Sequence, residues 1–185
     1  MKNILIATDF SEGSENAIQH ARSIAKAFKA KLIYFHAHFP VVPTNYLDPN
    51  GIYLSMPEID IQETLKGLEK SLHKYVEEDA SHGIDAAVAV EIGDITTGIH
   101  SLEEKLDLDL VIVSKTSSQN FLEKMLGSTA KSLVHDLHVP LLIIPSNYKE
   151  SIFDHVLYAT QLEFDEIPFI KQSLKWAAKG THSLT

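Results

Sequence analysis

Residues 110–144 read LVIVSKTSSQNFLEKMLGSTAKSLVHDLHVPLLII, and this segment indicates the architecture of the whole chain. It opens with the apolar run LVIV and closes with VPLLII, both of which have the length and composition of buried strands. Between them lie a polar turn, a short apolar stretch and Gly127-Ser128-Thr129, which begins a helical pattern. The first N–H groups of a helix have no partner within it, so a loop that leads from a strand into a helix can bind anions. We therefore expect any phosphate group to bind in this loop.

The order strand, polar turn, Leu126-Gly127-Ser128, helix, strand resembles the C-terminal part of universal stress protein domains. Nucleotide-binding members of that family carry Gly-x-x-Gly, then nine residues, then Gly-Ser or Gly-Thr. When the motif is aligned on Gly127-Ser128, its first two glycines fall on Ser114 and Ser117. The spacing is kept while two of the three glycines are replaced. The resemblance therefore implies the family fold with a degenerate nucleotide-binding loop.

Composition restricts the class of protein. Hydrophobic residues make up 44% of the 185 residues, enough for the core of one domain, and the absence of cysteine excludes disulfides and thiolate metal sites. The N-terminus lacks the apolar region of a signal peptide, and no apolar run approaches the ~18 residues of a membrane span. A formal net charge of −9 argues against nucleic acid as a partner, because basic residues supply most of that affinity. We expect a cytoplasmic protein that binds neither membranes nor nucleic acid.

The residues before 110 alternate between strand and helix patterns, which predicts an α/β fold with parallel strands and helices on both faces of the sheet. Ser11 and Asp94 stand where N-caps of the first and third helices are needed, and Gly83 ends the second helix. Residues 39–56 hold three prolines and no periodicity, which indicates a long loop. The expected strands are 3–8, 32–35, 86–90, 110–113 and 139–144, and helical spacing covers 17–28, 61–76 and 95–106.

The resemblance implies an open five-stranded sheet of order 3-2-1-4-5, a Rossmann-like arrangement of the adenine nucleotide alpha hydrolase type, in a domain that covers residues 1–148. In open parallel sheets the ligand lies beyond the carboxyl ends of the strands, where the strand order reverses. The loops that follow the first and fourth strands would then face one crevice.

The resemblance also implies which residues contact a ligand in that crevice. Asp9 matches an aspartate that contacts adenosine in nucleotide-binding relatives, although it can equally cap the turn into the first helix. Ala37 matches a position that packs against adenine, and plain packing at the strand end is the alternative. The expected contact set is Ala7, Thr8, Asp9, Ala37, Ser114, Lys115, Ser117, Gly127, Ser128 and Thr129.

Ser114 and Ser117 determine how strongly a nucleotide could bind. Glycine in such a turn permits positive φ and lets a phosphate approach the backbone N–H groups closely. Serine disfavours positive φ but adds a hydroxyl group that can form hydrogen bonds. ATP is the implied ligand, with its binding weakened at these two positions. Ser128 and Thr129 would offer N–H and hydroxyl groups to phosphate oxygens, or Ser128 would simply cap its helix.

The sequence lacks a recognisable metal site or catalytic constellation. His36 and His38 share one face of a strand, yet no third ligand stands at a suitable spacing, so no metal is expected. Ser128 and His135 would lie about two helical turns, ~10 Å, apart, too far for a nucleophile and its base. We expect a non-catalytic stress-response protein that senses a ligand and contacts other proteins. The alternative is a functional ATP-binding member of the family with at most slow hydrolysis.

Two expectations concern assembly. The resemblance implies that the apolar edge strand at 139–144 pairs with its symmetry mate, which gives a homodimer or a tandem pseudo-dimer. Residues 155–160, HVLYAT, match residues 3–8, NILIAT, and a helix-like segment follows. We interpret residues 149–185 as the strand and helix that begin a second, incomplete repeat, with chance similarity as the alternative. Such a unit cannot form a domain alone, so we expect it to pack on the first domain or a partner, or to be poorly ordered.

Overall fold

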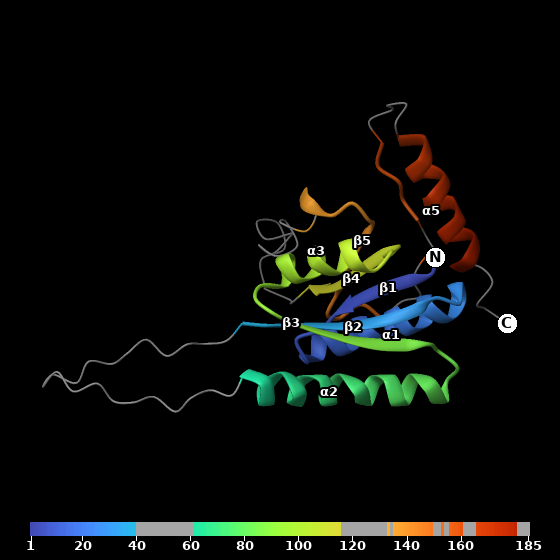
Figure 1. The fold of residues 1–185 in the computed structure, drawn as a ribbon. Helices are drawn as coiled ribbons and strands as arrows, with labels where there is room; N and C mark the ends of the chain where they lie inside the picture. Colours follow the sequence, from blue (N-terminus) through green and yellow to red (C-terminus); the bar gives the residue numbers. More distant parts are fainter. Residues whose placement is uncertain are drawn as a thin grey trace, which may run out of the picture.

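The computed structural model describes residues 1–39, 61–115, 133, 135–149, 153, 156–160 and 166–180. In it a five-stranded parallel sheet has the order β3-β2-β1-β4-β5, which confirms the predicted α/β fold and strand order (Figure 1). No helix within these ranges is long and apolar enough to cross a membrane. The strands are β1 (Asn3–Ala7), β2 (Lys31–His38), β3 (Ala86–Ile92), β4 (Leu110–Lys115) and β5 (Leu141–Pro145), and the labelled helices are α1 (Glu12–Phe28), α2 (Ile61–Ser81), α3 (Ile95–Lys105) and α5 (Ile167–Gly180).

Two hydrophobic cores lie on opposite faces of the sheet, and each strand contributes to both. On β1, Ile4 and Ile6 face the core under α1 and α2, whereas Leu5 and Ala7 face the core under α3. This alternation follows from the two-residue period of a strand. Figure 1 shows α2 and α3 on opposite sides of the sheet. Both faces are therefore covered, as parallel sheets require.

The predicted helix caps are present. The Ser11 hydroxyl accepts the N–H of Ser14 at 3.3 Å and begins α1. Asp94 accepts the N–H groups of Thr96 and Thr97, each at 3.0 Å, and begins α3. Gly83 follows the end of α2 with a φ of +72°, a conformation that glycine adopts without strain.

A buried ion pair joins α1, α2 and β2. Nε of Arg22 lies 2.6 Å from Oδ1 of Asp79, whose side chain is 1% exposed. The Tyr34 hydroxyl donates to Oδ2 of Asp79 at 2.6 Å. Burial, together with this hydrogen bond, raises the pKa of Tyr34 well above its usual range. The phenol therefore stays protonated into the alkaline range and continues to donate to Asp79.

Some boundaries differ from the expected ones. β4 continues through Ser114 and Lys115, which were expected in a turn, and Ser114 pairs with Ile144 of β5. β5 begins after Pro140, which has no N–H group to give to a strand ladder, instead of at residue 139. The helix expected after residue 127 falls largely outside the described residues, although positions 133, 135 and 136 are helical.

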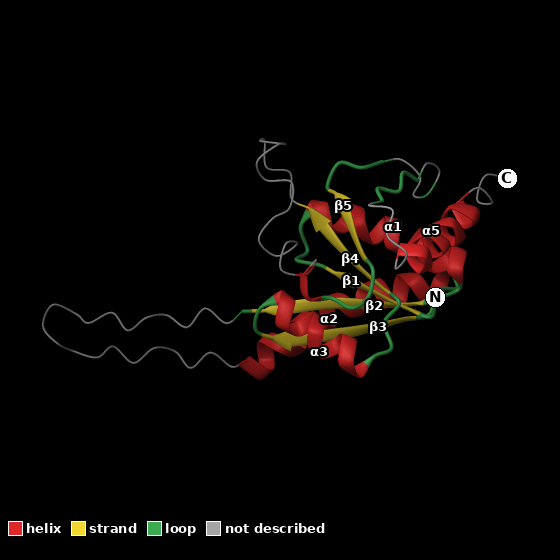
Figure 2. Ribbon diagram, turned by 90° about the horizontal axis from the view of Figure 1, so that it is seen from above, coloured by secondary structure: helices red, strands yellow, loops and turns green. Residues whose placement is uncertain are grey.

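The C-terminal segment forms the expected helix but not the expected strand. Residues 156–160 have no regular secondary structure, and Leu157 is 98% exposed. A strand needs backbone partners along an edge, and this segment joins none in the described sheet. α5 lies beside α1 (Figures 1 and 2). Trp176 packs against the core under α1, with its ring centroid 5.6 Å from that of Phe153.

Gly98 provides a test of the packing between α3 and the sheet. A Cβ atom at Gly98 would lie 2.5 Å from Cζ of Phe35, which is fully buried. Gly98→Ala should force the ring or the helix to move, at a cost of ~1–3 kcal/mol that exceeds the ~1 kcal/mol gained in helix propensity. We expect a lower urea midpoint by circular dichroism. In α2, nothing lies within 4 Å of a Cβ at Gly67, so Gly67→Ala should instead raise the midpoint. Equal shifts in the two variants would contradict this packing.

Candidate functional site

The carboxyl ends of β1 and β4 meet at the N-terminus of α1, where the strand order reverses. Gly13, in the first turn of α1, lies directly against β4 and the residue after β5. A Cβ atom at Gly13 would be 3.1 Å from Oγ of Ser114 and 3.0 Å from Cβ of Ser146. The N–H of Ser146 donates to the carbonyl of Lys115 at 3.1 Å. On the side of α1, the space beyond the carboxyl ends of β1 and β4 is therefore closed by tight packing.

Thr8 holds the turn between β1 and α1. Its hydroxyl donates to Oγ of Ser14 at 2.9 Å and accepts the N–H of Phe10 at 3.0 Å. The Ser14 hydroxyl in turn donates a hydrogen bond to the carbonyl of Ser11 at 2.9 Å. Thr8 is 5% exposed. Its side chain is thus occupied within the turn.

Asp9 leaves the end of β1 with an exposed side chain. Its Oδ1 accepts the N–H of Ser11 at 3.0 Å, so it caps the turn, as the alternative interpretation predicted. Partial burial would raise the pKa of Asp9, but hydrogen bonds from Ser11 and Ser14 outweigh that effect and lower it. The carboxylate is therefore charged at neutral pH and partly open to a ligand.

The expected contact residues separate onto the two faces of the sheet. Ala7 belongs to the core under α3, and Ala37 packs against that core. Lys115 shares this face by strand alternation, because Val113 lies in the same core. Ser114 has the opposite orientation and points toward Gly13 of α1. Ser117, Gly127, Ser128 and Thr129 lie outside the described residues.

Ser114 does not have the strained backbone that a glycine-requiring turn would impose. Among the described non-glycine residues, positive φ occurs at Phe10, Lys29 and Phe153. Ser114 instead belongs to β4 and is paired there with Ile144. The first position of the family motif therefore accepts serine in this chain without strain. Sequence comparison alone could not show this, because the motif records residue types and not dihedral angles.

His36 is a site residue whose role the sequence did not reveal. Its Nδ1 lies 2.8 Å from the carbonyl oxygen of Thr8, and its ring centroid is 5.0 Å from that of Phe10. It thus supports the β1–α1 turn from β2. The ring centroid of His38 lies 6.4 Å away. In the part of the chain that the structure describes, no group of three or more histidines and carboxylates is arranged to hold a metal ion.

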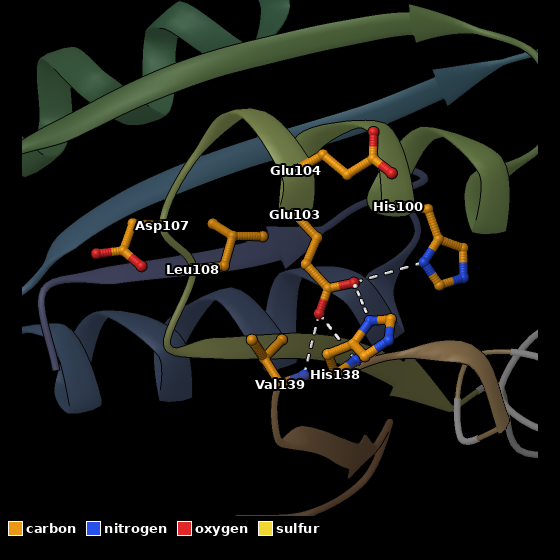
Figure 3. A pocket seen from close by; sticks show the side chains of 7 residues that line it. All are labelled: His100, Glu103, Glu104, Asp107, Leu108, His138 and Val139. Atoms are coloured by element: carbon orange, nitrogen blue, oxygen red, sulfur yellow. Dashed lines mark hydrogen bonds and ion pairs between the residues drawn. The ribbon is translucent and has the colours of Figure 1, made fainter.

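A second polar cluster surrounds Glu103 of α3, beside a hollow of about 320 Å³ (Figure 3). One carboxylate oxygen accepts the N–H groups of His138 and Val139, at 2.8 and 3.0 Å. The other lies 3.5 Å from Nδ1 of both His100 and His138. Glu103 therefore holds the segment that enters β5. The sequence offered no signal for this contact, since Glu103 and His138 are far apart in the chain and share no motif.

Comparison with known proteins agrees with this fold. A family model described as the universal stress protein family matches residues 1–145. Universal stress protein A of Salmonella typhi is 29% identical over 152 residues, which cover 80% of this chain and 97% of that protein. The structure of UspA from Lactobacillus plantarum aligns with a TM-score of 0.58 at 17% identity, covering 77% of this chain and 97% of that one. A universal stress protein in complex with cAMP aligns with a TM-score of 0.55 at 20% identity, covering 78% and 97%. The chain belongs to the universal stress protein family.

Proposed function

We propose that this protein is a non-catalytic stress-response protein that senses an adenine nucleotide on the α3 side of the crevice between β1 and β4. The observation that carries the proposal is the position of two small side chains, Ala7 and Ala37, on that face. Ala7 pairs with Phe35, so Ala37 is the next residue of β2 on the same face. Ala37 is half-buried, whereas Ala7 belongs to the buried core, so a flat ring would lie against Ala37. The charged Asp9 follows Ala7 by two residues.

The similar universal stress protein solved in complex with cAMP supports an adenine nucleotide as the ligand class. Lys115, on the same face, adds a positive charge at the end of β4, where a phosphate group would lie. Ser114 faces α1, so its hydroxyl does not take part. In this proposal the loop after β4, rather than Ser114, determines the strength of phosphate binding.

The proposal of a non-catalytic protein rests on how the described polar groups are used. The Thr8 hydroxyl is occupied by Ser14 and Phe10. Nδ1 of His36 faces a backbone carbonyl. Both side chains thus stabilise the turn between β1 and α1, and the Thr8 hydroxyl is not free to act as a nucleophile. The competing function is ATP binding with slow hydrolysis, in which Asp9 would be the candidate base.

Variants on the two faces of the crevice test the binding site. Ala37→Leu would fill the proposed ring position and should weaken cAMP and ATP binding at least about tenfold. Ser114→Gly is the matched control, because this residue has no positive φ and points toward α1, so affinity should stay within about twofold. Ser117→Gly should strengthen ATP binding. Isothermal titration calorimetry measures all three. Unchanged affinity in Ala37→Leu, or no binding of either nucleotide to the parent and Ser117→Gly proteins, would refute the proposed site.

A turnover assay separates sensing from hydrolysis. We expect the purified protein, incubated with ATP, to form no ADP above the background of a protein-free sample, measured by chromatography over several hours. Asp9→Asn keeps the acceptor oxygen that caps the turn but removes the charge. A slow ADP release that disappears in Asp9→Asn would contradict the non-catalytic assignment and support the alternative.

We also propose that β5 mediates a homodimer. β5 is an edge strand, and within the described sheet it pairs with β4 alone. The N–H of Ser146 points toward β4, so by the two-residue period of a strand the N–H of Ile143 points outward. An unpaired, apolar edge of this kind favours pairing with a second copy.

A single backbone donor tests this dimer. Ile143→Pro removes the outward N–H without removing a hydrogen bond to β4, and should convert a dimer into a monomer. Ile143→Ala trims the same side chain but keeps the N–H, so it should remain dimeric. Light scattering coupled to gel filtration gives the mass, and circular dichroism confirms that each variant is folded. A monomeric parent, or a dimeric proline variant, would rule out pairing through this edge.

A further inference from the structure

A hollow of about 460 Å³ lies where α5 packs against the first domain, at the opposite end of the sheet from the nucleotide crevice. Its walls include Met1, which precedes β1, and Phe28, the last residue of α1. α5 supplies the facing wall, and Figure 1 shows this helix beside the N-terminus. The volume falls within the range of ~300–1,000 Å³ that is usual for ligand pockets.

The apolar part of the hollow is held in place by packing. Trp176 and Phe28 both pack against the core under α1. Trp176 also contacts Phe153, with the two ring planes inclined by 43°. Because the core and Phe153 hold the Trp176 ring in place, a ligand does not have to fix its position on binding. The ring therefore offers a preformed apolar surface.

The polar part of the hollow carries an excess of positive charge. Lys171 and Lys175 are four residues apart on α5 and line the same opening. Neither lysine forms an ion pair with any described residue. Asp109 is the acidic residue of the lining, and its carboxylate accepts the N–H groups of Lys2 and Asn3. Two ammonium groups that pair with no carboxylate of the described residues thus stand at one opening, in a chain whose net charge is −9.

We propose that this hollow binds an amphipathic organic anion, with its carboxylate between Lys171 and Lys175 and its hydrocarbon body against Trp176. Each lysine is exposed, so the charged head group would lie at the opening while the apolar part enters. One carboxylate can accept hydrogen bonds from both ammonium groups. A simple inorganic anion could do the same but would not contact the apolar wall. The site shares no residue with the nucleotide crevice, so the proposal stands independently of the nucleotide ligand.

The chain itself supplies the reporter for the test. Trp176 is its single tryptophan, so intrinsic fluorescence observes this hollow directly. Titration of the full chain with sodium octanoate should produce a saturable change in Trp176 emission. The Lys171→Gln/Lys175→Gln variant should bind octanoate about threefold to tenfold more weakly, as expected for two exposed charge contacts. The matched control is Lys70→Gln/Lys74→Gln, which removes two lysines at the same spacing from α2 and should leave the affinity unchanged.

Three comparisons make the test decisive. Octanol, which has the same chain length without the charge, should bind more weakly than octanoate, and sodium phosphate should produce no response. ATP should not displace octanoate. The proposal is overturned if the emission does not saturate, if both lysine variants respond like the parent, or if octanol binds as tightly as octanoate. Circular dichroism of the variants confirms that a lost response is not caused by unfolding.

Discussion

The burial of β1 on both of its faces is the constraint on which the rest of the structure depends. The last four residues of β1 are buried, and the strand pairs with β2 along one edge and β4 along the other. Because its side chains alternate, Ile4 belongs to one core and Leu5 to the other. A strand in this position requires helices on both sides of the sheet. It also places the reversal of strand order at its own carboxyl end, where the nucleotide site is proposed.

The same alternation places the side chains at the carboxyl ends of the strands on two different faces of the sheet. Toward α1, the hydroxyl groups of Thr8 and Ser14 form a hydrogen bond with each other, and Ser114 packs against Gly13. Toward α3, Ala7 and Ala37 present little bulk. Ser114, which stands where the family motif has a glycine, lies in β4 and has no positive φ.

The C-terminal helix changes the opposite end of the sheet. Trp176 of α5 packs against the core under α1, although the segment before α5 pairs with no strand of the described sheet. The result is a hollow with an aromatic wall and two lysines, near Met1 and the end of α1. The two proposed sites thus lie at opposite ends of β1.

The order of strands and helices, the caps at Ser11 and Asp94, and the apolar edge segment could be predicted from the sequence, because each depends on residues within a few positions of one another. The family motif added the strand order. Tertiary structure alone decided which way Ser114 points, that Glu103 holds the backbone before β5, and that residues 156–160 do not form a strand although they match β1. These features depend on contacts with residues distant in the chain, and a local sequence pattern does not identify those residues.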